Sequence, residues 1–386
     1  MLHSREELLH RVENEYYDKI MLRNENGGIG MATIKDVAER VGVSVTLVSR
    51  TLNNQKGVKA ESRAKILQAM RDLNYVPNEL ARSLVLQRTN TIGIVLDYLS
   101  SPSASKLIKG LEKGVDDFDK EGVYNIIYCT SSGDFQKKQR HVAFLTKGRA
   151  DGVLIYGSLV TDDEIIMNLS QSNFPTTLIE NDLDSVNANK VVIDNVDGAY
   201  RATQYLIGLG HRRIAHVTGN INLKITLERL NGYMRALQDA QIPIDPTLII
   251  YPDFSVPQGG DTRDVWSIET YIRCGYESGG KLMDHPDRPT AIFFATDISA
   301  FGAMKAIEER GLSVPDDVSI FGFDDERPAD FDFQFEPIST VRQPLELAGY
   351  TGIKQVISSL QDLNAPKERI VLKTDLVIRN SCKEKV

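Results

Sequence analysis

Residues 33–53 read TIKDVAERVGVSVTLVSRTLN, and this stretch decides the fold of the N-terminal part of the chain. Its first apolar residues, including Val37 and Val41, follow the spacing of one face of a helix. Gly42 then interrupts the spacing and can adopt the positive φ of a tight turn. Ser44 occupies the N-cap position of a second helix. Helix, glycine turn and helix is the layout of a DNA-reading helix-turn-helix.

The outward face of the predicted second helix suits the floor of a major groove. It carries small or polar side chains and a single arginine, namely Val45, Thr46, Ser49, Arg50 and Asn53. Arg50 can form two hydrogen bonds with a guanine edge, and Val45 can touch a thymine methyl group. The alternative at this point is an αα-hairpin that binds nothing, because short motifs also occur by chance.

Residues 58–84 read VKAESRAKILQAMRDLNYVPNELARSL and extend the pattern. The spacing of apolar residues predicts a third amphipathic helix from Ala60 to Leu73. The segment NYVPN follows, and after it a short segment from Glu79 to Leu84. The side chains expected on the buried side of the third helix are Ile66, Leu67, Met70 and Leu73.

In these segments the chain resembles the lactose/galactose-repressor family of bacterial transcription regulators. The resemblance rests on three motifs in the right order and spacing, TIKDVA, GVSxxxVSRxLN and LNYxPNxxARSL, and it continues to about residue 380. It implies a sequence-specific DNA-binding regulator, a repressor, with a periplasmic-binding-protein-like core. It also implies that a small polar effector, such as a sugar or sugar derivative, controls the affinity for the operator.

The resemblance further implies a hinge helix from Asn78 to Leu84 that becomes ordered on the operator. Leu84 would insert into the central base step from the minor groove. Two such helices must pair, so we expect a homodimer on near-palindromic double-stranded DNA. The chain shows no leucine-heptad segment after TDLVIR, which favours a dimer over a tetramer. The expected DNA contacts are Thr33, Ser44, Val45, Thr46, Ser49, Arg50, Asn53, Tyr75, Asn78, Ala81 and Leu84.

The charge distribution separates a basic segment from an acidic remainder. Residues 31–90 hold ten Lys and Arg against five Asp and Glu, a net charge of +5, and residues 1–30 hold four against six, a net charge of −2. The other residues must therefore carry −11 to reach the total of −8. A phosphate-binding module fused to an acidic sensor has this distribution.

Length and composition narrow the class of protein. A chain of 386 residues exceeds the roughly 100–200 residues of one typical domain. No apolar run approaches the roughly 18 residues that a membrane span needs, and the first residues lack the apolar core of a signal peptide. Cys129, Cys274 and Cys382 form neither a metal-binding pattern nor a disulfide framework. We therefore expect a cytoplasmic protein without a metal or a cofactor.

From about residue 91, apolar runs of strand length alternate with helical patterns at 107–121, 136–147, 198–208, 227–240 and 299–310. This alternation predicts βαβ units with buried parallel strands. The predicted fold class is a small all-α helix-turn-helix domain plus a two-lobed α/β effector domain, and the resemblance implies that the chain crosses between the lobes. The predicted division is an extension at 1–30, the helix-turn-helix domain at 31–77, the hinge helix and linker at 78–90, the effector-binding and dimerisation domain at 91–380, and a tail at 381–386.

The strand ends predict the effector site, because ligands of open α/β sheets bind beyond the carboxyl ends of the strands. Arg229 and Asp324 also match family positions that hold the effector. Tyr156 could instead pack between the lobes, and Asp297 could cap the helix that follows it. The expected effector contacts are Tyr98, Ser103, Tyr156, Glu180, Arg229, Phe254, Thr296, Asp297 and Asp324, with Asp97 beside them at its strand end.

Two departures from the family pattern bear on the ligand. Many relatives carry NPFF after the first strand, where this chain has SPSA from Ser101 to Ala104. The loss of two rings disfavours a purine effector and favours a larger or more polar one. In addition, nineteen residues separate Ser255 from Gly275, where a few are usual. This insertion, with Trp266 and Tyr271, is either a lid over the site or an exposed loop.

Residues 1–30 lie outside the resemblance. They are either a helical extension or the product of a start codon assigned too far upstream, with Met31 as the true start. Two other functions compete with the regulator. A carbohydrate-active enzyme using paired carboxylates such as Asp324 and Asp325 would leave the helix-turn-helix unexplained, and the sequence shows no nucleophile elbow, P-loop or zinc motif. A sugar-binding protein that does not bind DNA is the third hypothesis.

Overall fold

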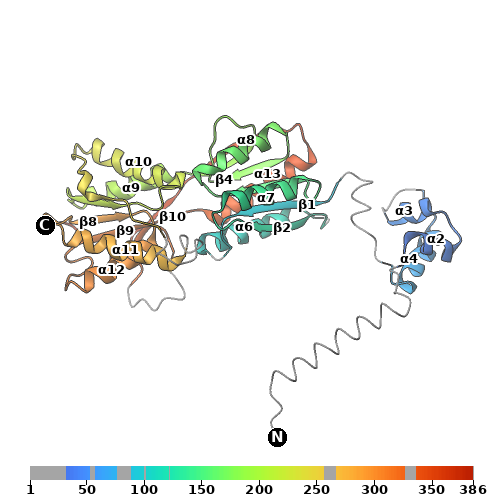
Figure 1. Cartoon of the computed structure of the whole chain (residues 1–386), viewed down its shortest axis with the longest axis horizontal. Coiled ribbons are helices and arrows are strands. Elements are labelled where there is room, and N and C mark those ends of the chain that lie inside the picture. The colour runs from blue at the N-terminus through green and yellow to red at the C-terminus, as the bar shows by residue number, and fades with distance from the viewer. Residues whose placement is uncertain are drawn as a thin grey trace, which may run out of the picture. The chain divides into compact units, whose positions relative to one another are not determined.

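The computed structural model describes residues 32–52, 57–75, 88–99, 101–120, 122–255, 267–326 and 336–385. The described residues form two units, one within residues 1–87 and the other within residues 88–386 (Figure 1). The first unit is called the head below, and the second is called the body.

The head begins with two helices joined by a glycine turn. Helix α2 (Ile34–Val41) starts with a capping box, in which Thr33 and Asp36 exchange side-chain and backbone hydrogen bonds. It ends at Gly42, whose φ of 73° is left-handed. Helix α3 (Val45–Leu52) follows after Ser44, whose hydroxyl accepts a hydrogen bond from the Leu47 amide over 3.2 Å. These local contacts confirm the predicted helix, turn and cap.

A third helix, α4 (Ala60–Asp72), completes the core of the head. Leu67 was expected on the buried side of α4, but it is 39% exposed, and Ala69 is buried instead. The apolar stripe of α4 therefore lies one position away from the predicted one at this turn. The buried apolar residues of the head are Val37, Ala38, Val48, Ile66 and Ala69.

The body consists of two lobes, each a six-stranded sheet with helices on both faces (Figure 1). The sheet of the first lobe, called the N-lobe, has the order β11-β5-β4-β3-β1-β2, and all its strand pairs are parallel. Helices α6 (Pro102–Phe118) and α13 (Leu345–Gln361) cover one face, and α7 (Phe135–Thr146) and α8 (Asp163–Gln171) cover the other. The strands are β1 (Thr91–Leu96), β2 (Asn125–Thr130), β3 (Gly152–Tyr156), β4 (Thr176–Ile179), β5 (Asn189–Ile193) and β11 (Arg369–Leu372).

The sheet of the second lobe, called the C-lobe, has the order β12-β10-β9-β8-β6-β7, and only the β10–β12 pair is antiparallel. Figure 1 shows α9 (Asn195–Gly208) and α10 (Lys224–Asp239) on one face and α11 (Ile268–Met283) and α12 (Asp297–Glu308) on the other. The strands are β6 (Ile214–Val217), β7 (Ile249–Ile250), β8 (Ala291–Phe294), β9 (Ser319–Asp324), β10 (Ser339–Arg342) and β12 (Asp375–Val377). Two short 3₁₀ helices, η1 (Val160–Asp162) and η2 (Pro246–Leu248), lie in the connections.

The chain passes between the lobes three times, from β5 to α9, from β10 to α13 and from β11 to β12. Neither lobe is therefore a continuous segment, as the resemblance implied. The structure confirms the predicted class of a helical head with a two-lobed α/β body. No helix in the described ranges is both long enough and apolar enough to cross a bilayer.

Several helices of the body begin earlier than the spacing of apolar residues predicts. Helix α6 begins at Pro102 because Ser101 caps it, and its hydroxyl accepts a hydrogen bond from the Ala104 amide. In the same way, Asp194 caps α9 by accepting a hydrogen bond from the Asp197 amide. Polar capping residues lie upstream of the apolar positions, so periodicity alone places these helix starts too late.

Helices α11 and α12 cross at very short range. A Cβ on Gly275 would lie 1.9 Å from the Ser299 carbonyl oxygen, and one on Gly302 would lie 2.1 Å from that of Ile272. Only glycine permits this approach. The nineteen-residue insertion is not a loop throughout, because it is helical from Ile268 onward. Trp266 lies outside the described residues.

The C-terminal residues pack against the C-lobe. Cys382 joins the core on the α9–α10 face, and the Ser381 hydroxyl donates a hydrogen bond to the Ile320 carbonyl over 2.6 Å. The Lys385 amide donates to the Leu209 carbonyl over 2.7 Å. The segment predicted as a tail at 381–386 is thus part of the lobe as far as residue 385.

Candidate functional site

Helix α3 presents one face to solvent and anchors the other in the head. Val48 and Thr51 are buried, and the Thr51 hydroxyl donates a hydrogen bond to the Leu47 carbonyl over 2.9 Å. Val45, Thr46 and Arg50 are exposed on the other side, as predicted for groove contact. This face therefore offers one guanidinium between small side chains.

The other predicted DNA contacts occupy different positions. Thr33 is exposed at the capping box of α2, and Ser44 is exposed at the cap of α3. Ser49 is half-buried, and Tyr75 packs against the core of the head. Four predicted contacts lie outside the described residues, namely Asn53, Asn78, Ala81 and Leu84, and so does the predicted hinge helix.

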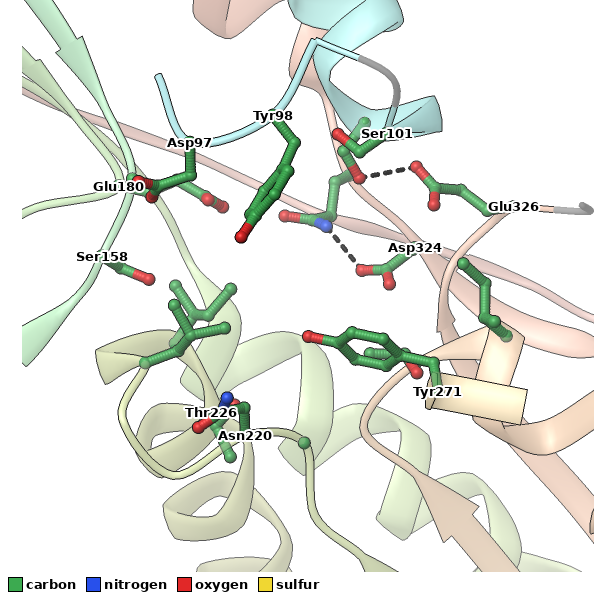
Figure 2. Close-up of a pocket in the computed structure, with 18 of the residues that line it drawn as sticks. Asp97, Tyr98, Ser101, Ser158, Glu180, Asn220, Thr226, Tyr271, Asp324 and Glu326 are labelled. Carbon is green, nitrogen blue, oxygen red and sulfur yellow. Dashed lines mark hydrogen bonds between the residues drawn. The ribbon is translucent and has the colours of Figure 1, made fainter. Parts of the chain in front are cut away.

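The body holds a cavity of about 420 Å³ between its lobes (Figure 2). Its lining comes from the carboxyl ends of strands in both lobes, as the rule for open α/β sheets predicts. Tyr98, Tyr156 and Tyr271 supply aromatic surface. Seven of the nine predicted effector contacts line it, namely Tyr98, Ser103, Tyr156, Glu180, Arg229, Thr296 and Asp324.

Phe254 and Asp297 are not among the lining residues. Phe254 lies behind Tyr271, with 4.9 Å between the ring centroids in an edge-on arrangement. The Asp297 carboxylate accepts hydrogen bonds from the Glu326 amide over 2.8 Å and from the Thr340 hydroxyl over 2.7 Å. The alternative that Asp297 caps α12 is wrong, because the Thr296 side chain takes that position. Asp297 instead holds the loop after β9.

Arg229 is the best-anchored side chain of the cavity and is only 2% exposed. Its Nη1 donates to the Ala295 carbonyl over 2.6 Å and lies 3.1 Å from Oδ1 of Asp324. Its Nε donates to Asn195 over 3.0 Å, and its guanidinium carbon lies 3.7 Å from the centroid of the Phe323 ring. Its Nη2 has no hydrogen-bond partner among the described residues. One nitrogen, which carries two N–H groups, is therefore left for a ligand.

Asp324 and Glu180 are carboxylates held in unusual backbone conformations. Asp324 has a φ of 110° and Glu180 a φ of 61°, both left-handed. Such conformations are strained for residues other than glycine and tend to persist at functional sites. Burial raises the pKa of Asp324, although the neighbouring guanidinium of Arg229 opposes the rise. Burial also raises the pKa of Glu180, to about 7.

Glu326 joins the two lobes directly at the edge of the cavity. Its Oε1 accepts a hydrogen bond from the Ser103 hydroxyl of the N-lobe over 2.6 Å, drawn as a dashed line in Figure 2. Lys106 Nζ lies 3.9 Å away and also donates to the Asp325 carbonyl over 2.9 Å. Burial, and next the nearby charge of Asp324, raise the pKa of Glu326 to about 7. This contact is one that a change in lobe closure would break.

A second direct contact joins the lobes elsewhere. Leu159 and Leu223 form an isolated antiparallel bridge, and the Lys224 amide donates to the Ser158 carbonyl over 2.8 Å. The Lys224 ammonium pairs with Asp163 of the N-lobe. The cavity is therefore bounded by contacts that depend on the relative position of the lobes.

Several lining residues that lie on loops or in the first turns of helices, rather than at strand ends, were not predicted from the sequence. Gln343, at the crossing from β10 to α13, donates to Asp324 over 2.7 Å. Tyr271 belongs to the insertion that was expected to be either a lid or an exposed loop, yet it lies in the first turn of α11. The only sequence signal that could have indicated Gln343 is its polar side chain near a segment that connects the two lobes. The polar lining residues that were missed include Ser101, Ser158, Asn220, Thr226, Ser267, Glu269, Glu326 and Gln343, of which Thr226 lies in α10 and Glu269 in α11.

The arrangement suits non-covalent recognition. Buried polar atoms without partners in the described ranges include Arg229 Nη2, Glu180 Oε1, Ser158 Oγ and Gln343 Oε1. A hydroxyl-rich ligand could satisfy each of them. Within the described ranges, no group of His, Cys, Asp and Glu is placed to hold a metal ion. A helix-turn-helix head and a two-lobed ligand-binding body together define a DNA-binding protein that senses a small molecule.

Comparison with known proteins agrees with that class. Residues 33–78 match the model of bacterial regulatory proteins of the lacI family, and residues 203–382 match that of the periplasmic binding protein-like domain. The transcriptional regulator DegA of Bacillus subtilis is 32% identical over 90% of this chain and 97% of its own. The ribose operon repressor of Haemophilus influenzae is 31% identical over 91% and 98%.

Among solved structures, the lac repressor dimer bound to operator and the anti-inducer ONPF is 27% identical. It covers 91% of this chain and 99% of its own, with a TM-score of 0.74. The chain belongs to the lacI family of bacterial regulatory proteins. It is a DNA-binding transcription regulator and not an enzyme.

Proposed function

We propose that the chain is a repressor whose operator affinity is set by a polyhydroxylated effector, a sugar or sugar derivative, in the cavity between the lobes. The observation that carries the proposal is the set of buried, unpartnered polar atoms around Arg229 and Glu180. This set contains both donors and acceptors, and the tyrosine rings of the same lining can cover the apolar face of a sugar. The similarity to the ribose operon repressor and the lac repressor supports the same ligand class.

The effector contacts that we propose are the seven predicted lining residues together with Ser158, Glu326 and Gln343. Ligand binding would alter the relative position of the lobes, because the Ser103–Glu326 and Leu159–Leu223 contacts lie across the gap between them. A ligand can shift such an equilibrium only through different contacts in its two states. Arg229 and Asp324 would provide the largest difference, since they are the most deeply buried charged residues of the lining.

On the DNA side, we propose that α3 enters the major groove with Arg50 on a base edge, and that Thr33, Ser44, Ser49 and the third helix position the backbone. Two copies would bind a near-palindromic operator as a homodimer, in the way that the lac repressor dimer is bound to its operator. We place the domain boundaries at residues 31–77, 78–90 and 91–385. A regulator of cellular DNA would act in the cytoplasm.

The test is a titration of a near-palindromic operator by the full chain, with and without a panel of sugars, in an electrophoretic shift assay. At least one sugar should change the apparent operator affinity of the wild type. Asp324→Ala should retain operator binding and lose the response, whereas Asp316→Ala, an exposed carboxylate paired with Lys383, should respond as the wild type does. An Asp324→Ala protein that responds normally would remove the cavity from the mechanism.

A further inference from the structure

The charge of the cavity lining restricts the chemical class of the effector further than the capacity of the lining to bind hydroxyl groups does. Arg229 is the single cationic side chain among the described lining residues. Five lining residues carry carboxylates, namely Asp97, Glu180, Glu269, Asp324 and Glu326. The class of ligand depends on which of these carboxylates already have a counterion.

Three of the five are buried, with exposed fractions of 8% for Glu180, 7% for Asp324 and 8% for Glu326. Asp324 pairs with Arg229 over 3.1 Å, and Glu326 has the Ser103 hydroxyl and, at 3.9 Å, the Lys106 ammonium. The other two carboxylates say less about the charge of the ligand. Asp97 pairs with the buried Lys138 over 3.0 Å, and Glu269 is exposed to water.

Glu180 differs from all of these. It forms no ion pair and no side-chain hydrogen bond with any residue in the described ranges, and its Oε1 is buried without a partner. A buried carboxylate normally has a cation or several hydrogen-bond donors. In Figure 2, Glu180 lies on the opposite side of the cavity from Glu326 and Asp324. The Arg229 charge acts on Glu180 only from beyond ion-pair distance, so within the described ranges this buried carboxylate has no paired cation.

The backbone at Glu180 gives independent support. The residue follows β4 with a left-handed φ of 61°, which glycine or asparagine would adopt at lower cost. A strained residue that also buries an uncompensated charge is doubly unfavourable for stability. Such combinations are expected where the side chain serves a ligand.

We propose that the effector carries a protonated amino group, as an amino sugar does, and that the Glu180 carboxylate binds this group. Arg229, Asp324 and Glu326 then bind hydroxyl groups on the far side of the ligand. This inference rests on the proposed function and specifies the ligand class of the same site. The lining also disfavours anionic ligands, such as uronates or sugar phosphates, because each would meet the buried carboxylates.

The experiment is calorimetric titration of the full chain with matched ligands in the gluco, galacto and manno series. Each series contains the amino sugar, the neutral parent sugar, the N-acetylated form and the uronate. In the series that binds, the amino sugar should bind about tenfold or more tighter than the neutral parent, since an ammonium donor forms an ion pair with the carboxylate that a hydroxyl donor cannot form. The N-acetylated form should lose this advantage, and the uronate should bind most weakly.

Glu180→Gln tests the residue, because it keeps the shape and one acceptor oxygen while removing the charge. In this variant the amino sugar should bind no tighter than the neutral parent. Glu164→Gln is the matched control, since Glu164 is exposed on α8 of the same lobe and does not line the cavity. It should keep the full preference. If Glu180→Gln fails to fold, the ligand series on the wild type still decides.

The outcomes separate this inference from the proposed function. Neutral sugar binding that matches amino sugar binding in the wild type, or a preference that survives in Glu180→Gln, would overturn the inference alone. The sugar-controlled repressor would then stand. If no member of any series binds at millimolar concentration, both the inference and the sugar effector of the proposed function are wrong.

Discussion

The head and the body recognise their ligands with opposite physical means. On α3 of the head, Val45, Thr46 and Arg50 are exposed and water already solvates them. Around the cavity of the body, Glu180, Asp324 and Glu326 are buried and their pKa values are raised. In the head, the one described non-glycine residue with a left-handed φ is Asn74, at the end of α4, whereas two lining carboxylates of the body are strained.

The difference follows from what each part must bind. A DNA duplex brings a high density of negative charge, so an exposed basic surface gains affinity without any desolvated group of its own. A small polar molecule offers few contacts, so its site must hold unsatisfied donors and acceptors in place beforehand. We therefore expect mutations in the cavity to change both stability and binding, and mutations on α3 to change binding alone.

The largest effect should come from Arg229→Ala. The substitution leaves Asp324 buried without the guanidinium that pairs with it, and breaking a buried pair in this way typically costs about 3–5 kcal/mol. The free energy of unfolding should fall by that order, and the effector response should disappear. Chemical denaturation followed by circular dichroism measures the first quantity.

Arg310→Ala provides the comparison for Arg229→Ala. Arg310 pairs with Asp284 over 2.7 Å at the surface, where the pair is solvated. Exposed pairs contribute little, so its stability should remain close to that of the wild type. Equal losses in the two variants would mean that burial does not set the cost, and the contrast between head and body would lose its physical basis.

Glu180→Gln should stabilise the ligand-free protein at alkaline pH. The folded state binds the Glu180 proton up to a pKa of about 7, above the value of about 4.3 in an unfolded chain. Stability contributed by this carboxyl therefore falls as pH rises from about 4 to 7 and stays low above it. Removing the charge should gain roughly 3–4 kcal/mol at pH 8 and little near pH 4.

The measurement is the difference in unfolding free energy between Glu180→Gln and wild type across that pH range. Glu326 and Asp324 titrate in both proteins, so their contributions largely cancel in the difference. A gain that is the same at every pH would indicate relief of packing or backbone strain rather than of buried charge. It would also show that buried charge does not distinguish the cavity of the body from the exposed surface of the head.

Arg50→Ala should weaken operator binding by about 1–3 kcal/mol, the usual worth of one bidentate base contact. The midpoint of thermal unfolding should not move, because Arg50 is exposed. Operators altered at one base pair of each half-site should be bound with less discrimination by the variant. Lys65→Ala, an exposed cation on α4, tests whether charge alone is responsible. An equal loss in both variants would show that Arg50 reads no base.

The smallest effect should come from Ser44→Ala, which removes the cap of α3. Loss of a side-chain cap typically costs about 1 kcal/mol. Hydrogen exchange in the full chain should show less protection of the first amides of α3, including Leu47, and unchanged protection in the body. A change that spread to the body would contradict the division into two units.

The sequence predicted the head well because its signals are local. The capping box at Thr33 and Asp36, the turn at Gly42 and the cap at Ser44 lie within twelve residues of chain. Leu67 was misplaced because a helical stripe fixes a face only to within about one position. Strand ends similarly predicted most of the cavity, since the position of ligands in open α/β sheets is a rule of topology.

What the sequence did not predict depends on contacts between distant segments. Gln343 and Glu326 reach the cavity only because the chain crosses between the lobes nearby and because Asp297 holds the loop after β9. Asp297 itself was expected either in the site or at the N-cap of α12. The Thr296 side chain caps that helix instead, and the Asp297 carboxylate accepts a hydrogen bond from the Thr340 hydroxyl. The sequence around Glu180 gives no sign that its carboxylate lacks a partner, because its surroundings come from segments that are distant in the chain.

The three crossings between the lobes also determine how this protein must be made. Helix α13 and strand β11, which cover and complete the N-lobe sheet, follow nearly the entire C-lobe in the chain. On the ribosome, Ile92, Ile94 and Leu154 therefore emerge long before Ile353 and Val356, the side chains that bury them. At roughly 5–20 residues per second, the delay is about 10–50 seconds. The nascent chain must keep that apolar face apart from other chains for this time, so synthesis is the stage at which the protein is most exposed to aggregation.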